Sequence, residues 1–460
     1  MNTEQQENRD GLDEDFALGN RLIDEVIEAI EQGDSVRLTQ LLEPLHAADI
    51  ADILEQISAT QRRALLRLWK GEMEGEVLSE LDESLREEVM ESLAPEELAE
   101  AVRDLETDDV VDLLEDLDAP QQDEILEVLE DADRVAVQQA LTYPEDSAGR
   151  LMQRELVVAP EHWTVGEAID YLRTQQDLPE QFYHMILVDP KMRPTGYVTL
   201  GKLLSSPRDM KLQDITEDSF RTISVNQDEE DVAYAFNQYH LISAPVVDKD
   251  DRLVGVITID DAMAVLDEEH EEDMLRLAGV GEGSLSDRVI ETSKRRLPWL
   301  FVTMFAAFAA SFVISQFSDT IAEFVALAVL MPIVASMGGN AGTQALTVAV
   351  RALATKDITS ANVWRVIRRE ILVGLVNGAV FAVVIGGLGM LWFGMPMLGV
   401  VIGAALVINL LVASFVGVVV PVLLDKVGVD PALASGAFVT TMTDVVGFFA
   451  FLGLASVVLL

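Results

Sequence analysis

The sequence contains no cysteine and only five histidines among its 460 residues. The lack of cysteine excludes disulfides and thiolate metal sites, and the scattered histidines offer no zinc cluster. The first residues, MNTEQQENRDGLDEDF, are polar and acidic, so they do not resemble a secretory signal. We therefore expect the chain to start in the cytosol, with residues 1–19 as a disordered acidic leader.

Basic residues are scarce. Lysine and arginine number 32 against 79 aspartates and glutamates, which gives a formal net charge of -47. From Pro298 onward there are only six basic and seven acidic residues, so nearly all of the excess charge precedes Pro298. This balance argues against nucleic acid as a partner, because phosphate binding needs clustered lysine and arginine. It favours cations as ligands, although a generally acidic surface that keeps a protein soluble is the alternative.

Residues 20–142 carry short stretches with apolar residues at helical spacing, such as VRLTQLLEPL and DDVVDLLEDL. Capping or breaking signals, among them Asp34-Ser35 and Ser58, stand between these stretches. Helices this short are marginal alone, but they bury a continuous core when they stack. We expect an all-α, superhelical N-domain that senses or binds, since the stretch shows no catalytic constellation.

Residues 143–267 alternate β-branched strands with helices. FYHMILVDPKMRPTGYVTLGKLL predicts strand, turn, strand and helix, and HLISAPVVDKDDRLVGVITIDDAMAVL repeats that order about sixty residues later. The stretch APVVDKDDRLVGVITIDD resembles a CBS domain, and the first copy matches more loosely. We therefore expect an α/β tandem CBS pair. The resemblance implies a regulatory module that binds adenine nucleotides or metal ions, with ATP as one candidate ligand.

Residues 268–297 are expected to form one long connecting helix, which opens with an acidic run and ends with three bases before Pro298. Residues 298–460 contain five apolar runs, each long enough to cross a bilayer core. These runs predict an all-α transmembrane domain of five helices. Their approximate bounds are 298–317, 321–350, 371–393, 398–424 and 432–460.

The loops between the apolar runs predict the orientation. Bases precede the first run and lie between the second and third, at Arg351, Lys356, Arg365, Arg368 and Arg369. The loops near Asp319 and at 394–397 carry none. By the positive-inside rule, the N-terminus is expected in the cytosol and the C-terminus outside a plasma (inner) membrane.

Asp444 is the one ionisable residue within SGAFVTTMTDVVGFFAFL, in the fifth run. A carboxylate in hydrocarbon costs on the order of 3 kcal/mol, so it needs a water-filled path or a partner. No lysine or arginine lies at comparable depth in any run. An unpaired carboxylate among hydroxyls, with Thr440 one turn before it, suits a cation path. The alternative is a protonated aspartic acid that is hydrogen-bonded between helices.

The second run is unusual in its sequence MGGNAGTQALTVAVRAL. Gly338 and Gly339 bare the backbone, and small residues of this kind also form ordinary packing seams between membrane helices. Asn340 is harder to explain by packing, because an amide in lipid needs partners. Asn409 and Asn377 lie in the middle of the fourth and third runs, where a packing hydrogen bond is an alternative to a role in the path.

The stretches GGNAGTQALTVAVRALATKDI, DPALASGAFVTTMTDVVGF and YPEDSAGRLM resemble the MgtE family of magnesium channels. The order of domains is also similar over nearly the full length. The resemblance implies a homodimer in membrane lipid with a magnesium pore between subunits. It implies that Asp444 binds the ion, helped by Asn340 and nearby backbone carbonyls, for which Gly338 and Gly339 are the candidates. Magnesium keeps its octahedral water shell, so a few carboxylates and polar groups suit it.

The same resemblance implies that cytosolic magnesium closes the pore by binding acids of the CBS pair, the N-domain and the connecting helix. The candidate residues are Asp228, Glu230, Asp261, Glu269, Glu272 and Asp273, with Asp108 and Asp112 facing them from the N-domain. Any single one of these acids is also explained as solvated surface. His240 stands where family members often have an acid, which leaves the number of sensing sites open.

Two other functions remain open at this point. In a coupled secondary transporter Asp444 would exchange protons or sodium, but five spans without an internal repeat do not favour this. In a CBS-based energy sensor the membrane part would be only an anchor, which has no need of Asp444 or Asn340. Nothing in the sequence indicates an enzyme. We therefore expect a multidomain membrane protein that conducts divalent cations, chiefly Mg²⁺.

Overall fold

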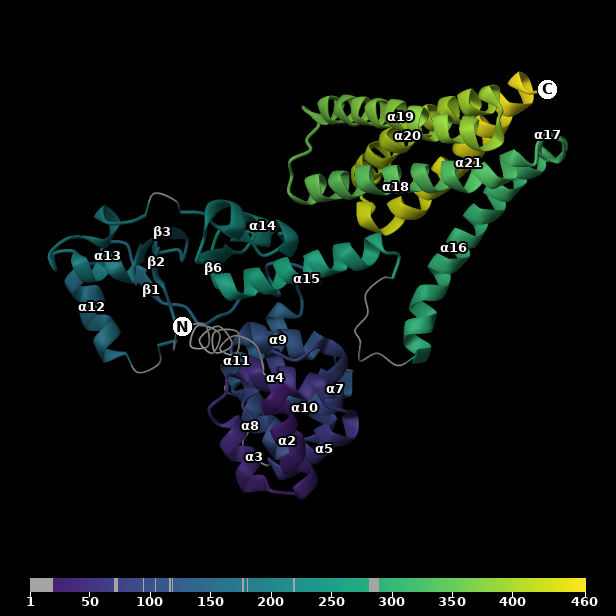
Figure 1. Cartoon of the computed structure of the whole chain (residues 1–460). Helices are drawn as coiled ribbons and strands as arrows, with labels where there is room; N and C mark the ends of the chain where they lie inside the picture. The colour runs from purple at the N-terminus through teal and green to yellow at the C-terminus, as the bar shows by residue number, and fades with distance from the viewer. Residues whose placement is uncertain are drawn as a thin grey trace, which may run out of the picture. The chain divides into compact units, whose positions relative to one another are not determined.

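The computed structural model describes residues 20–69, 73–93, 95–103, 105–115, 117, 119–175, 178–179, 181–217, 220–280 and 289–460. The chain divides into two compact units, Met1–Asp267 and Glu268–Leu460. Figure 1 shows the helices and strands of each. The leader expected at residues 1–19 lies outside the described residues.

The first unit begins with short helices whose starts follow from their capping residues. Asp34 accepts a hydrogen bond from the backbone of Arg37 at the start of α3, and Ser58 forms a capping box with Gln61 in α5. The helices are α2 (Asn20–Gln32), α3 (Ser35–Leu42), α4 (Ala47–Gln56), α5 (Ala59–Leu68), α6 (Gly75–Ser79), α7 (Glu83–Ser92), α8 (Pro95–Arg103), α9 (Thr107–Glu115), α10 (Ala119–Val128) and α11 (Asp131–Ala140).

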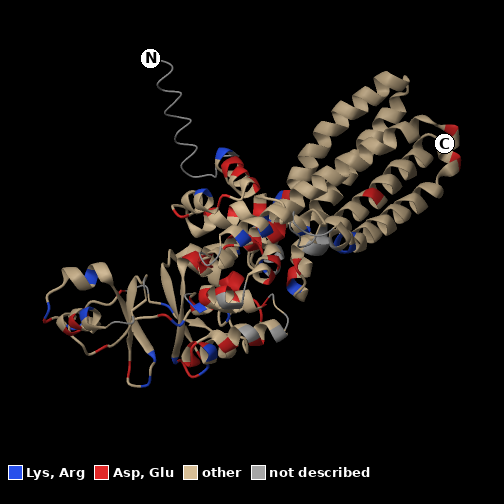
Figure 2. Ribbon diagram, turned by 90° about the horizontal axis from the view of Figure 1, so that it is seen from below, with Lys and Arg blue, Asp and Glu red and all other residues tan. Residues whose placement is uncertain are grey.

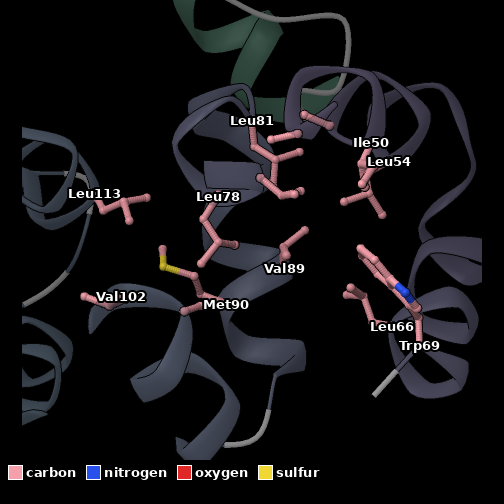
Figure 3. Close-up of a cluster of buried hydrophobic side chains, with 14 of the residues drawn as sticks. Ile50, Leu54, Leu66, Trp69, Leu78, Leu81, Val89, Met90, Val102 and Leu113 are labelled. Atoms are coloured by element: carbon pink, nitrogen blue, oxygen red, sulfur yellow. The ribbon is translucent and has the colours of Figure 1, made fainter. Parts of the chain in front are cut away.

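These helices share one apolar core, which extends from Ile23 to Ala140. Figure 3 shows part of this core, with Leu78, Val89 and Met90 gathered between the helices. Because none of the helices described in this region exceeds 13 residues, tertiary packing rather than helix propensity must stabilise them. The all-α N-domain expected from the short periodic stretches is confirmed.

The CBS region consists of two similar three-stranded sheets, in the orders β1-β2-β3 and β4-β5-β6. In each sheet the first strand pairs parallel with the second, and the second pairs antiparallel with the third. The strands are β1 (Val158–Pro160), β2 (His184–Val188), β3 (Pro194–Thr199), β4 (Ile223–Ser224), β5 (Ser243–Val247) and β6 (Leu253–Thr258), with helices α12 (Val165–Thr174), α13 (Leu200–Ser205), η1 (Leu212–Asp214) and α14 (Glu229–Tyr239). The expected tandem α/β pair is confirmed.

The single connecting helix expected at 268–297 is not continuous. Helix α15 (Ile259–Leu277) starts within the second CBS repeat, carries the acidic run, and ends at Leu277. Gly279 adopts φ 70°, a left-handed conformation that terminates helices. Residues 281–288 lie outside the described residues, and α16 (Val289–Ser315) begins after them. Pro298 lies inside α16 rather than at its start.

The second unit holds the helices of the membrane part: α16, α17 (Ser318–Glu323), α18 (Ala326–Ala354), α19 (Val363–Phe393), α20 (Pro396–Val427) and α21 (Pro431–Val458). Among the described residues, five helices are long and apolar enough to cross a membrane, as the five apolar runs predicted. In Figure 2 these helices carry very few charged residues, in contrast to the elements that precede them. The helix with the largest buried share is α20, which packs against α18, α19 and α21.

We predict that Leu78→Ala lowers the free energy of unfolding of the N-domain by about 2–5 kcal/mol, because the side chain is fully buried and leaves a cavity. Hydrogen exchange of the α6 amides in the intact protein measures the loss. Leu204→Ala is the matched control, since Leu204 is 72% exposed. Equal exchange in the two variants would contradict the assigned core.

Candidate functional site

Helices α18 and α21 run antiparallel past each other with glycines at their contacts. A Cβ atom on Gly342 of α18 would meet Val439 and Thr443 of α21, and Gly338 and Gly447 both face the side chain of Asn409. Gly338 and Gly447 therefore lie at the same height along the helix axes. Gly342 and Thr443 lie together at a second height, one helical turn away.

Asn340 and Asp444 lie between these two contact levels. Asn340 stands between Gly338 and Gly342 in α18, and Asp444 stands between Thr443 and Gly447 in α21. The two polar residues predicted for the ion path therefore lie at the same depth of the bundle, although they are 104 positions apart in the sequence.

Asp444 is partly exposed, and Thr440, one turn before it, is exposed. Two neighbouring hydroxyls are used within the helix: Thr441 donates to the carbonyl of Ala437 at 2.6 Å, and Thr443 donates to that of Thr440 at 3.0 Å. The sequence has no lysine or arginine in residues 298–350 or 370–425, which hold most of the first four membrane helices. No base in these residues can therefore form an ion pair with Asp444.

A polar stripe follows the outer side of α18. Asn340, Thr343, Gln344 and Thr347 are all exposed and recur at helical spacing. Gly339 lies on the open side, with nothing within 4 Å of an added Cβ. Hydrocarbon offers no hydrogen bonds to such a stripe, so it requires water or another protein surface.

The structure separates the two glycines that the sequence placed together in the path. Gly339 is partly exposed beside Asn340, whereas Gly338 is buried against Asn409. Gly338 thus has the packing role that the sequence left open as an alternative. Gly339 remains the candidate whose backbone contacts an ion.

An acidic cluster lies in the first unit, where the N-terminal end of α9 meets the start of α15. Burial raises the pKa of Glu106 and of Asp109 to about 7, and repulsion from Glu155 or Asp261 adds to it. Burial also raises the pKa of Asp108 well above its usual range, with Asp261 as the next cause. Burial raises the pKa of Asp261 itself to about 6.

Asp108 and Asp261 hold the centre of this cluster. One oxygen of Asp108, Oδ2, is buried without a hydrogen-bond partner among the described residues. Asp261 accepts hydrogen bonds from the backbone and the hydroxyl of Thr258, at 3.2 and 2.6 Å. Asp108 and Asp261 are therefore close enough to repel each other, and their role in binding a cation stays a prediction.

The other predicted sensor acids have different surroundings. Asp112 is ion-paired with Arg86 at 2.7 Å, and its charge also adds to the raised pKa of Asp109. Asp228 caps α14 by accepting a hydrogen bond from the backbone of Glu230. His240 is the left-handed residue that ends α14, with φ 54°. Within the described ranges, no three histidine, aspartate or glutamate side chains converge as a set of metal ligands.

The acids at the end of α15 lie beside the membrane helices of the second unit, where Glu269 is partly exposed. Arg276 bridges Glu272 at 2.6 Å and Asp430, the N-cap of α21, at 3.0 Å. Burial raises the pKa of Asp273, and Asp430 adds repulsion. Leu277 packs against the apolar cluster of α18, α20 and α21.

Sequence reasoning missed Glu106, Asp109, Glu155 and Asp260 in the acidic cluster. The sequence points to Asp108 and Asp112 because residues four apart share a helix face. The adjacent pair Asp108-Asp109 at the helix start was the available signal. Arg86 is distant in sequence from Asp112, so helical spacing cannot reveal the ion pair between them.

We predict that the contact between α9 and α15 weakens as the pH rises from 5.5 to 8 in buffer without divalent cations. The raised pKa values mean that protons stabilise the contact at low pH and that this stability is lost as the pH passes about 6 to 7. The protection of the α9 amides, which is the intrinsic exchange rate divided by the observed rate at the same pH, should fall over this range.

Asp109→Asn should flatten this dependence, and Asp250→Asn, at an exposed turn, should leave it unchanged. Protection of these amides that is higher at pH 8 than at pH 5.5, relative to the intrinsic rate at each pH, would have the wrong sign and would overturn the assignment.

Sequence comparisons agree with the division of the chain into an N-domain, a CBS pair and a membrane part. The family model described as "Divalent cation transporter" matches residues 331–454, the "MgtE intracellular N domain" matches 45–146, and the CBS domain matches 148–209 and 212–268. The chain is 36% identical over 320 residues to "Magnesium transporter MgtE" of Enterococcus faecalis. The aligned residues cover 70% of this chain and 71% of the relative.

A second relative covers more of the chain. The "Magnesium transporter MgtE" of Thermus thermophilus is 32% identical over 438 residues, covering 94% of this chain and 97% of the relative. A solved structure, the cytosolic domain of the Mg²⁺ channel MgtE in complex with ATP, is 30% identical and has a TM-score of 0.49, covering 53% of this chain and 99% of that chain. The chain belongs to the MgtE family of magnesium transporters.

Proposed function

We propose that the chain forms a magnesium channel of the inner membrane, with a pore that Asp444 and Asn340 line together. The observation that carries this proposal is that the two side chains lie at one depth, on antiparallel helices, without a base in their spans. Thr440 and the backbone at Gly339 add oxygen ligands on the open side. Oxygen ligands and few charges suit an ion that keeps much of its water shell.

A homodimer explains why the polar stripe of α18 is exposed. A two-fold partner would cover Asn340 and Gln344 and would place two Asp444 carboxylates at one axis. Two carboxylates then balance one divalent ion. In the lipid of a membrane, an uncovered row of amides and hydroxyls would lack hydrogen-bond partners.

The pore would be closed by cytosolic Mg²⁺ bound among the acids of α9 and α15. Without cations, the buried acids Asp108 and Asp261 repel each other, and a divalent ion turns that repulsion into attraction. The end of α15 packs on the same helices that carry Asn340 and Asp444, through Leu277 and the Arg276–Asp430 ion pair. A change in α15 thus has a direct mechanical route to the pore.

Two parts of the proposal rest on other grounds. In this proposal the N-terminus lies in the cytosol and the C-terminus outside, because bases gather in the first turns of α16 and around the loop between α18 and α19. ATP at the CBS pair remains a prediction from the resemblance. A coupled transporter stays the second candidate, and currents from single molecules in a bilayer distinguish it from a channel.

We predict that Asp444→Asn lowers the Mg²⁺ flux by at least about tenfold, because losing 1.4 kcal/mol of charge attraction already reduces ion occupancy that far. Uptake into liposomes that contain the purified protein and a Mg²⁺ dye measures it. Asp319→Asn, at an exposed site in α17, is the control and should transport normally. Undiminished flux with Asp444→Asn would sink the pore assignment.

For the sensor, we predict that Asp108→Asn raises the cytosolic Mg²⁺ concentration needed for half-closure by about tenfold, because the cluster loses a buried carboxylate that would bind the ion. The maximal flux at low cytosolic Mg²⁺ should stay normal. Patch recordings with titrated Mg²⁺ on the cytosolic face measure both quantities. Asp250→Asn serves as the control, and an unchanged midpoint in Asp108→Asn would contradict the sensor.

A further inference from the structure

Asn409 in the middle of α20 is fully buried, yet only half of its amide is hydrogen-bonded. Its Nδ2 donates to the carbonyl oxygen of Val334 in α18 at 2.9 Å. Its Oδ1 is buried without a hydrogen-bond partner among the described residues. An unsatisfied amide oxygen costs free energy in an apolar bundle. The stability of the bundle therefore does not explain why an amide occupies this position.

Two glycines face this amide from two other helices. A Cβ atom on Gly338 of α18 would lie 2.8 Å from Asn409 Cγ, and one on Gly447 of α21 would lie 2.9 Å from the same atom. Real side chains do not come so close, so each glycine backbone rests directly on the amide. The amide thus fills the space between α18 and α21, and its size sets how far apart their backbones lie.

The same two helices carry the proposed pore residues. Gly338 precedes Asn340 by two residues, and Gly447 follows Asp444 by three. We propose that Asn409 is a positioning residue, which sets the separation and rotation of α18 and α21 so that Asn340 and Asp444 meet the ion together. This inference rests on the proposed function, since it takes these two residues as the ion's ligands.

The hydrogen bond to Val334 gives the amide a task that an apolar side chain of similar volume cannot perform. Val334 lies one turn before Gly338, so this bond fixes the rotation of α18 about its axis as well as its distance from α20. A leucine would keep the distance but release the rotation. Rotation decides whether Asn340 points at the ion path, and misplacements near 1 Å matter for such sites.

The first test compares Asn409→Leu with Asn377→Leu in the full-length protein in liposomes. Asn377 is an exposed amide in the middle of α19, so this control loses the same group elsewhere. We expect Asn409→Leu to raise the half-saturating Mg²⁺ concentration by at least about tenfold and to reduce the preference for Mg²⁺ over Co²⁺. A wild-type half-saturation and preference would overturn the inference.

The second test is a double-mutant cycle between Gly338 and Asn409. Gly338→Ala should clash with the amide, and Asn409→Ala should open a gap. If the two positions form one spacer, the double variant should recover Mg²⁺ affinity relative to Gly338→Ala alone. Purely additive losses would contradict a spacer. Should Asn409→Leu fail to assemble, this cycle decides alone.

The outcomes also separate this inference from the proposed function. Normal flux in Asp444→Asn removes the pore assignment itself. Loss of flux in Asp444→Asn together with normal Mg²⁺ affinity in Asn409→Leu removes only the positioning role. Changed affinity in both Asn409→Leu and Asn377→Leu would show a general effect of amide loss and would likewise overturn the positioning role.

Discussion

Negative charge without a matching base is the constraint on which both units of this protein depend. Asp444 lies in a span with no lysine or arginine, and Asp108 and Asp261 are brought together away from water. Such acids must hold a proton, bind a mobile cation or move apart. A protein that needed only stability would place a base beside them, as Arg62 lies beside Glu88 at 2.8 Å in the N-domain core.

Packing decides which of the membrane acids and amides can act together. Helix α20 is buried on several sides and touches α18, α19 and α21. Its contacts with α19 are also glycine-mediated, since a Cβ atom on Gly386 would lie 2.7 Å from the carbonyl oxygen of Gly399. Close backbone contact leaves little freedom for helices to slide or rotate. The equal depth of Asn340 and Asp444 in the bundle is thus a consequence of the apolar and glycine contacts around α20.

Much of the fold could be predicted because its signals are local. Capping residues such as Ser58 marked the short helices, and the strand–turn–strand pattern located the CBS repeats, whose equivalent residues His184 and Ser243 are 59 positions apart. The sequence does not predict the end of α15 at Leu277. Gly279 is a signal for a helix end, but the acidic run and the bases after it fit a single polar helix equally well.

The sites were less predictable, since burial and distant partners define them. Asp112 has the spacing expected of a sensor acid, but it forms an ion pair with Arg86. Gly338 and Gly339 are neighbours in sequence and face opposite surroundings. Helical spacing assigns residues to a face, whereas the neighbouring helix decides what that face meets.

The excess of acidic residues explains a preference for cations but not the location of a site. Most acids among the described residues are partly or fully exposed, and water and salt screen them from one another. Glu106 and Asp109 differ, because burial raises the pKa of each to about 7. Near neutral pH each is therefore partly protonated, so a cation that binds there must displace protons, and its affinity should increase with pH. Desolvation, rather than the number of charges, therefore turns an acidic surface into a responsive site.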